Sequence, residues 1–231
     1  MGSRYLDSAG KTLDDYPRPS VAVDTAVLTV SDEGALSVLL ALTNDAARVG
    51  EEEWRLPGTF LHPGETLAAA VLRSLRAKAG VEGLAPRQLQ VFDEPARDNR
   101  GWVLSVAHYD VVRMGRLEAS PRTRVAPVDA LPALTYDHAA IVAFAVEALR
   151  ADYRRMPDPA GLLDSPFTMS GLRAVHESVA GEMLLPDTFR RAMLPQLTAT
   201  GEYARAGRGR PAELYRNEVR HAEQRRQGSL V

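Results

Sequence analysis

The stretch PGTFLHPGETLAAAVLRSLRAKAGV, residues 57–81, decides the fold of the first half of the chain. It opens with two Pro-Gly pairs, which predict tight turns in a loop. An apolar residue then recurs at every fourth position, which is the spacing of one face of an α-helix. These positions are Leu67, Val71, Leu75 and Ala79. Gly80 follows as a suitable C-terminal cap, so we expect a loop followed by a helix over residues 65–79.

Apolar and β-branched segments surround this loop and helix. Residues 21–30 and 36–42 are separated by the polar sequence SDEG and predict a β-hairpin. Residues 53–57 predict a short strand, and residues 87–93 and 102–112 predict two more strands with a polar loop between them. The first part of the chain is therefore expected to be mostly sheet with one inserted helix.

The remainder of the chain is expected to contain three helices and a hairpin. Residues 137–155 predict a long helix with Asp137 as its N-cap, and a Pro-containing linker follows it. Residues 167–181 predict a second helix capped by Thr168 or Ser170. A short helix is expected from Asp187, its N-cap, to Leu194, and then a strand, a Gly-rich turn and a strand.

The composition sets further limits on the class of protein. The chain has 231 residues, of which 45% are apolar, and it has no cysteine, so disulfides and thiolate metal sites are excluded. It has no apolar run near the length of a membrane span and no apolar segment at its N-terminus. We therefore expect a cytoplasmic protein that does not enter a membrane.

The charge is unevenly distributed along the chain. From Thr188 onward there are nine Arg or Lys residues and four Asp or Glu residues, a balance of +5. Because the net charge of the whole chain is −2, the residues before Thr188 carry a net charge of −7. Such an asymmetry indicates either a module that meets a polyanion or a solvated charged tail.

Residues 57–81 resemble the Nudix box, Gly-x5-Glu-x7-Arg-Glu-apolar-x-Glu-Glu-x-Gly-apolar, in their frame. The matching positions are Glu65, Arg73, Leu75, Gly80 and Val81. The positions that differ are Thr59 for the opening Gly, Ser74 for the Glu after the Arg, and Ala77 and Lys78 for the Glu pair. Magnesium is held mainly by carboxylates, phosphates and water. The resemblance therefore implies a Nudix fold, and the lost acids imply no catalytic residues, no metal site and no ordinary hydrolysis.

The altered box loses three acids and gains one cation, Lys78, at a position where the family has an acid. Arg73 and Lys78 are candidates to bind a pyrophosphate without magnesium. Trp54 is a candidate to stack on a base, and Arg55, Arg97 and Arg100 are candidates to bind phosphate. The alternatives are that the tryptophan packs in the core and that the cations are solvated.

The C-terminal order of helix, turn, short helix and hairpin is that of a winged helix. In DTFRRAML we expect Phe189, Ala192 and Met193 to face the core, and the exposed residues to enter the DNA major groove. The candidate DNA-binding residues of this helix are Thr188, Arg190 and Arg191. Arg208 and Arg210 flank a glycine at the hairpin tip and are expected to enter the minor groove of double-stranded DNA.

The joint order of these parts resembles the NrtR family, Nudix-related transcriptional regulators of NAD metabolism. The resemblance implies an α+β fold with a Nudix-like mixed sheet and helix domain followed by a winged helix-turn-helix domain. The division we expect is an irregular arm over 1–20, an effector-binding domain over 21–155 and a DNA-binding domain over 156–231. The resemblance also implies a homodimeric repressor of NAD biosynthesis or salvage genes, with no cofactor, that ADP-ribose or a related NAD metabolite releases from DNA.

Three other functions stay open at this point. One is a Nudix hydrolase of a nucleoside diphosphate derivative with an atypical metal site, using Glu51, Glu52 or Glu53. Another is a regulator that uses its Nudix fold only to dimerise. The third is an RNA-binding or adaptor protein, which a preference for RNA over duplex DNA would reveal.

Overall fold

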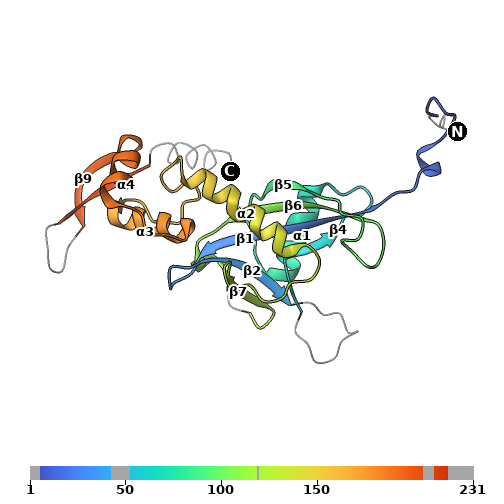
Figure 1. Ribbon diagram of the computed structural model, residues 1–231, viewed down its shortest axis with the longest axis horizontal. Coiled ribbons are helices and arrows are strands. Elements are labelled where there is room, and N and C mark those ends of the chain that lie inside the picture. The colour runs from blue at the N-terminus through green and yellow to red at the C-terminus, as the bar shows by residue number, and fades with distance from the viewer. Residues whose placement is uncertain (1–5, 43–52, 119, 205–210, 218–231) are drawn as a thin grey trace.

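The protein consists of a larger lobe built on a sheet and a smaller helical lobe with a hairpin (Figure 1). In the computed structural model the described residues are 6–42, 53–118, 120–204 and 211–217. The smaller lobe lies at the opposite end of the molecule from the N-terminal arm, which extends away from the sheet (Figure 1). The arm contains one short 3-10 helix, η1 (Leu13–Asp15).

A mixed seven-stranded sheet forms the larger lobe, with the order β3-β2-β1-β6-β5, while β4 pairs with β1 and β7 with β2. The strands are β1 (Ser20–Val30), β2 (Leu36–Leu42), β3 (Trp54–Arg55), β4 (Gly58–Phe60), β5 (Arg87–Phe92), β6 (Val103–Val111) and β7 (Thr123–Pro127). The predicted hairpin of β1 and β2 is confirmed, with Leu28 opposite Val38. The only parallel pair within the described sheet joins β1 to β6. These strands are segments far apart in sequence, which is why the sequence does not predict their pairing.

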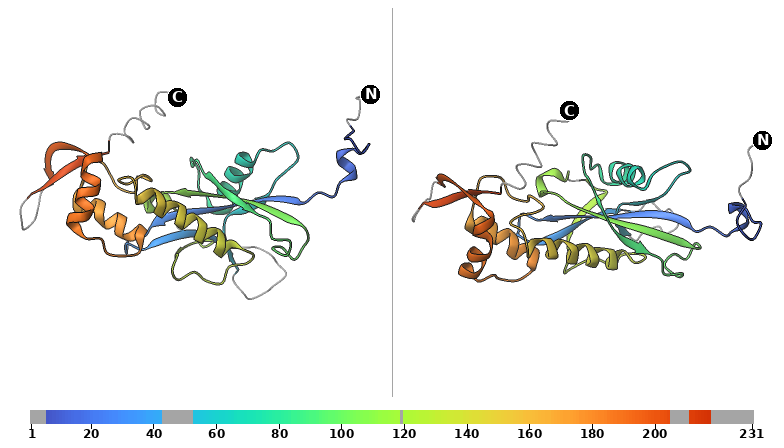
Figure 2. Two further views of the ribbon diagram at one scale, coloured as in Figure 1. Left: turned by 45° about the horizontal axis from the view of Figure 1, so that its top comes forward. Right: turned by 90° about the horizontal axis from the view of Figure 1, so that it is seen from above.

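Helices cover both faces of this sheet (Figure 2). Along β1, Val23 and Val27 pack with helix α1 (Leu67–Ala79), whereas Ala26 and Leu28 pack with helix α2 (His138–Tyr153). Successive side chains of a strand point to opposite faces, so both sets are buried and β1 is apolar almost throughout.

Helix α1 confirms the sequence prediction from residues 57–81. The Thr66 hydroxyl accepts a hydrogen bond from the Ala69 N–H at 3.2 Å, and Gly80 ends the helix with a φ of 66°. The positive φ is the left-handed conformation that favours glycine at a helix C-terminus. The helix begins two residues after Glu65 because Thr66 caps it.

The smaller lobe confirms the predicted winged helix. It consists of α3 (Met169–Ala180), α4 (Pro186–Met193) and a three-stranded sheet in the order β8-β10-β9. Its strands are β8 (Phe167–Thr168), β9 (Thr198–Ala204) and β10 (Ala212–Arg216). Its core contains Phe167, Leu172, Phe189, Met193 and Tyr215. Thr168 caps α3, as one of the two predicted candidates, by accepting from the Gly171 N–H at 3.0 Å.

Two details predicted for α4 are wrong. Its N-cap is Leu185 rather than Asp187, because Pro186 occupies the first helical position, where its fixed φ suits a helix start. Ala192 is exposed rather than buried, since an eight-residue helix has room for one narrow stripe and Phe189 and Met193 form it.

Three strands and two further 3-10 helices were not predicted. Strands β4 and β7 lie in Pro- and Gly-containing segments, and β8 has only two residues. The 3-10 helices are η2 (Met114–Arg116) and η3 (Leu194–Gln196). Among the described residues, no helix combines the length and apolarity needed to cross a membrane.

Candidate functional site

A cavity of about 370 Å³ opens in the larger lobe beside the N-terminus of α2. Residues from β1, β4, the loop after β5 and the segment before α2 surround it, although they are far apart in the sequence. The lining residues are Ala22, Asp24, Ala41, Leu42, Arg55, Leu56, Gly58, Thr59, Phe60, Lys78, Arg97, Asp98, Arg100, Val103, Arg122, Tyr136 and His138.

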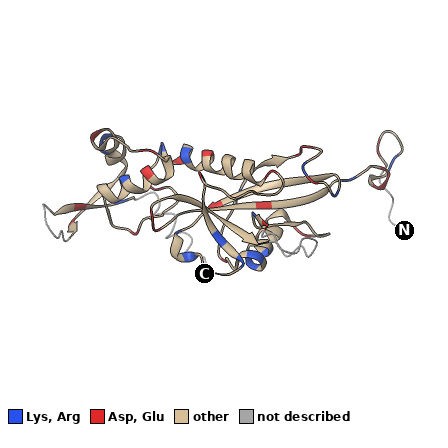
Figure 3. Cartoon of the chain, turned by 60° about the horizontal axis from the view of Figure 1, so that its bottom comes forward, with Lys and Arg blue, Asp and Glu red and all other residues tan. Residues whose placement is uncertain are grey.

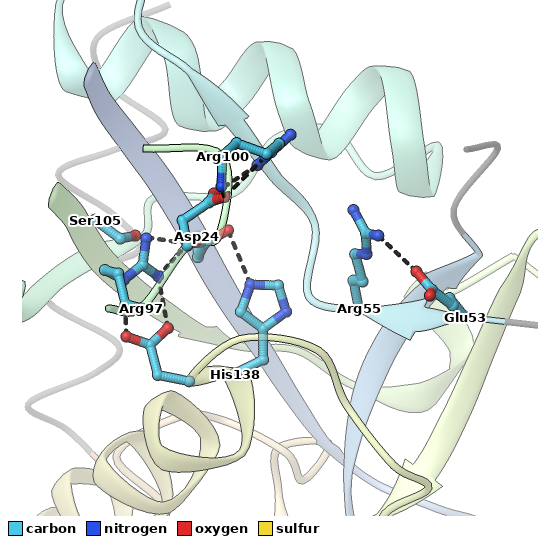
Figure 4. A network of polar contacts seen from close by, with 9 residues as sticks. Asp24, Glu53, Arg55, Arg97, Arg100, Ser105 and His138 are labelled. Atoms are coloured by element: carbon cyan, nitrogen blue, oxygen red, sulfur yellow. Dashed lines mark hydrogen bonds and ion pairs between the residues drawn. The ribbon is translucent and has the colours of Figure 1, made fainter. Parts of the chain in front are cut away.

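The carboxylate of Asp24 lies at the centre of the polar contacts in this cavity (Figure 4). It accepts a hydrogen bond from the Ser105 hydroxyl at 2.6 Å and lies 3.3 Å from Nε2 of His138. Nδ1 of His138 accepts the Leu56 N–H at 3.1 Å, so Nε2 carries the proton and donates to Asp24. Burial raises the pKa of Asp24, but these hydrogen bonds and the charge of Arg97 outweigh it and lower the pKa, so Asp24 is ionised.

Arg97 links this carboxylate to the start of α2. Its guanidinium donates two hydrogen bonds to Asp137, at 2.5 and 2.8 Å, and lies 3.6 Å from Asp24. Only 3% of the Arg97 side chain is exposed, so two carboxylates neutralise a buried charge. Asp137 precedes α2 as predicted, yet it makes no side-chain cap because its carboxylate is bonded to Arg97.

Gly58 gives this carboxylate its space. A Cβ added to Gly58 would lie 1.9 Å from Oδ1 of Asp24, a distance that no real contact allows. Any larger residue in place of Gly58, the glycine of the first Pro-Gly pair, would therefore displace Asp24 from its hydrogen bonds.

Cations and aromatic rings form the wall of the cavity. Arg55 is bonded to Glu53 at 2.6 Å, and Arg100 to Asp98 at 2.6 and 2.9 Å. The hydrogen bonds from Arg100 lower the pKa of Asp98. Nζ of Lys78, in the last turn of α1, donates to the Gly58 carbonyl. The guanidinium groups thus have fixed orientations, while their charges point toward one volume.

Tyr136 presents its ring to two of these cations. The guanidinium carbons of Arg55 and Arg100 lie 5.2 and 5.5 Å from its centroid, and that of Arg100 lies 5.3 Å from the Phe60 ring. Tyr136 has a φ of 58°, which costs a residue other than glycine about 1–3 kcal/mol and is found most often at ligand sites.

Four of the six predicted effector-binding residues line this cavity: Arg55, Lys78, Arg97 and Arg100. Trp54 and Arg73 are not among the lining residues. Trp54 is partly buried against the core beneath α2, which is the alternative that the sequence left open for it. Asp24, Tyr136 and His138 were missed.

Arg73 instead holds the loop before α1. It donates to both oxygens of Glu65 at 2.8 Å, to the Thr59 hydroxyl at 3.1 Å and to the Phe60 carbonyl at 3.0 Å. The hydrogen bonds from Arg73 lower the pKa of Glu65 to about 2. Glu65 and Arg73, two positions that match the Nudix box, thus form a structural clasp for the loop.

The residues of this site do not fit a magnesium ion. Glu65 uses both carboxylate oxygens to bind Arg73, and Ser74 is buried in α1. Lys78 places a positive charge in the cavity where the box has an acid. Across the described ranges no group of three His, Cys, Asp or Glu side chains is arranged to hold a metal ion. Glu51 and Glu52 lie outside those ranges, and Glu53 is bonded to Arg55.

In the smaller lobe, α4 exposes Thr188, Arg190 and Arg191 as predicted. Arg190 donates to the Tyr215 hydroxyl at 3.2 Å, and Tyr215 donates to Glu213 at 2.5 Å, so Arg190 is tied to β10. The hydrogen bond to Glu213 raises the pKa of Tyr215. Six of the nine basic residues counted from Thr188 lie outside the described residues, and Arg208 and Arg210 are two of these six. Lys and Arg positions occur on both lobes (Figure 3).

Comparison with known proteins matches each lobe to a family. Residues 20–147 match the NUDIX domain, and residues 159–217 match the NrtR DNA-binding winged helix domain. The chain is 29% identical over 212 residues to the ADPR responsive transcriptional repressor NtrR of Acinetobacter baylyi, covering 87% of this chain and 83% of the relative. It is also 32% identical to the ADP-ribose pyrophosphatase of Methanocaldococcus jannaschii, over 62% of this chain and 85% of that enzyme.

Solved structures of Shewanella oneidensis NrtR agree with both lobes. The structure with a 27mer DNA has 30% identity and a TM-score of 0.69, and the match covers 84% of this chain and 92% of that chain. The NUDIX domain of the same protein with ADP ribose has 25% identity and a TM-score of 0.50, over 61% of this chain and 95% of that one. The chain belongs to the NUDIX family and combines its NUDIX domain with the DNA-binding winged helix domain of NrtR.

Proposed function

We propose that this protein is a transcriptional repressor that binds DNA through its winged helix and releases it when ADP-ribose, or a related NAD metabolite, fills the NUDIX cavity. One observation carries the proposal: a cation-lined cavity with an altered Nudix box shares its chain with a winged helix. The relatives that combine the same two parts include a repressor described as responsive to ADPR.

The cavity has the chemistry that a nucleoside diphosphate sugar needs. Its volume of about 370 Å³ falls within the range of small-ligand sites. Arg55, Lys78 and Arg100 supply positive charge for a diphosphate, and the ionised Asp24 can accept a hydrogen bond from a sugar hydroxyl. Because Lys78 stands at a box position usually held by glutamate, we propose that it replaces the charge of a metal ion and that binding needs no magnesium.

The winged helix is proposed to act on double-stranded DNA as part of a cytoplasmic homodimer. Two copies of α4 would then meet half-sites about 34 Å apart on a palindrome, with Thr188, Arg190 and Arg191 toward the bases and phosphates. Arg208 and Arg210 are proposed for the minor groove. The regulated genes are proposed to be those of NAD biosynthesis or salvage. The boundary between the effector-binding and DNA-binding domains is proposed to lie between residues 155 and 156.

The second candidate is a hydrolase, which the pyrophosphatase relative favours. Two features oppose it. The altered box has lost the other acids, and the remaining Glu65 uses both of its carboxylate oxygens to bind Arg73 rather than a metal. Turnover of ADP-ribose measured with and without magnesium separates the two functions. We expect no magnesium-dependent turnover, and a robust rate would establish the hydrolase.

Binding of the effector is tested by calorimetry with ADP-ribose in the presence of EDTA. Lys78→Glu restores one acid of the box and reverses one charge in the cavity, so we expect weaker metal-free binding than in the unaltered chain. Arg76→Glu is the matched control, because Arg76 is 72% exposed on the same helix and does not line the cavity. Equal effects of the two substitutions would show that Lys78 has no specific part in binding.

A further inference from the structure

Helix α2 has one end in the cavity and the other end against the winged helix. It runs from His138 to Tyr153, and 16 residues of α-helix span about 24 Å. Figure 1 shows the helix crossing the sheet lobe and ending beside the winged helix. Its buried face includes Ile141, Ala145 and Leu149, which pack in the main core, so the helix is a stiff connection along its whole length.

Residues that line the cavity hold the N-terminal end of α2 through polar contacts. Asp137, the residue before the helix, binds Arg97 through two charge-assisted hydrogen bonds. His138, the first helical residue, binds Asp24 and the Leu56 N–H. A ligand anion that draws Arg97 away from Asp137 would therefore remove one of the two polar anchors at the start of α2.

The C-terminal end of α2 is held by a buried polar junction. The Tyr153 hydroxyl donates to Asp158 at 2.8 Å, and the same carboxylate accepts from the Leu162 and Leu163 N–H groups. The Asp158 N–H in turn donates to Nε2 of His176 at 3.3 Å. The linker between the two lobes is thus tied to both α2 and α3.

His176 connects this junction to the DNA-facing helix. Its ring centroid lies 4.8 Å from that of Tyr153 and 4.9 Å from that of Phe189, both in edge contact. Phe189 is the buried anchor of α4, the helix that carries Thr188, Arg190 and Arg191. Nearby, Nε of Arg150 in α2 donates to the Val179 carbonyl of α3 at 3.0 Å. A displacement of the α2 C-terminus must therefore displace α3 and α4 or break these contacts.

We propose that α2 transmits the state of the cavity to the DNA-binding helix, with the Arg97–Asp137 pair at its input and the Tyr153–Asp158–His176 junction at its output. The inference rests on the proposed function, because it explains how an effector in that cavity would act on DNA. Loss of the Asp137 carboxylate then mimics a ligand that occupies Arg97 and weakens DNA binding without any ligand. Loss of the Tyr153 hydroxyl disconnects the two ends.

The test is a double-mutant cycle on DNA affinity, measured by fluorescence anisotropy of the full chain without ADP-ribose. Asp137→Asn is expected to weaken binding about fivefold in the unaltered background, and less than about twofold when Tyr153→Phe is present. Independent sites this far apart give additive effects. An additive cycle would overturn the coupling, whatever ADP-ribose does.

The controls remove the same groups where α2 is not involved. Tyr16→Phe also removes a tyrosine hydroxyl that donates to an aspartate, Asp7, and Asp14→Asn also breaks an Arg–Asp pair, both in the N-terminal arm. Neither should alter DNA affinity or interact with the other. Arg97→Lys, which keeps the charge but loses the two-pronged geometry, provides a second input variant should Asp137→Asn fold poorly.

ADP-ribose is then added to each variant to separate the inference from the proposed function. A non-additive cycle with no response of the unaltered chain to ADP-ribose would retain the coupling and refute the effector. A response that persists at full size in Tyr153→Phe, with an additive cycle, would retain the effector and refute the path through α2.

Discussion

Replacing Asp137 with asparagine should destabilise the NUDIX lobe by about 2–3 kcal/mol. Breaking a buried ion pair by removing one partner costs about 3–5 kcal/mol, because the remaining charge stays buried without compensation. Arg97 meets this condition, with 3% of its side chain exposed and two hydrogen bonds to Asp137. The loss is smaller than the full value because Asp24, 3.6 Å away, still neutralises part of the charge.

Thermal unfolding followed by tryptophan fluorescence measures this loss in the lobe concerned. The chain has two tryptophans, Trp54 and Trp102, and both lie in the NUDIX domain. For a protein of this size 1 kcal/mol corresponds to about 2–4 °C, so the midpoint should fall by about 4–12 °C.

Asp14→Asn is the control for this prediction. It breaks the Arg18–Asp14 pair, whose side chains are 59% and 80% exposed, and exposed pairs contribute about 0–1 kcal/mol. Equal midpoint shifts for Asp14→Asn and Asp137→Asn would refute the claim that burial makes the Arg97–Asp137 pair important.

Three further predictions concern DNA binding and pH. We assign Arg191 a phosphate contact, so Arg191→Ala should weaken binding about equally across DNA sequences and make the fall of log affinity with log salt shallower by about 1. An unchanged slope in a salt titration would refute the phosphate contact. The NMR titration of Glu65 should give a pKa of about 2, and Arg73→Ala should return it toward 4.5; no change would show that the clasp is absent in solution. Burial lowers the pKa of His176 from 6.5 to about 4, so the unfolded chain takes up the proton first and winged-helix stability should fall as the pH drops from 6.5 toward 4. Denaturation monitored in that lobe should show this loss, and His176→Gln should flatten it.

The elements with a local physical signal were predicted correctly from the sequence. Helix α1 has an apolar residue in every turn and ends at a glycine that adopts the left-handed conformation. Strands β4 and β7 were missed because their Pro- and Gly-containing segments become strands only through pairing with β1 and β2. Local propensity contains no information about such partners.

The candidate site was predicted in part for a similar reason. Lys78 and Arg55 were identified because they stand in or beside the altered box, whereas Tyr136 and His138 reach the cavity from a segment about 60 to 80 residues later. Asp24 did leave a signal, since it is a charged residue in the middle of an apolar strand. A buried carboxylate in such a place needs hydrogen-bond partners, and it finds them in Ser105 and His138.

The central claim is that a metal-free ligand in the NUDIX cavity controls DNA binding. The measurement that tests it most directly is the affinity of the full chain for a palindromic duplex from upstream of an NAD-biosynthesis gene, in EDTA, with and without ADP-ribose. We predict tight binding that ADP-ribose weakens about tenfold or more, within the usual range of allosteric coupling. Tight binding that saturating ADP-ribose leaves unchanged would contradict the claim.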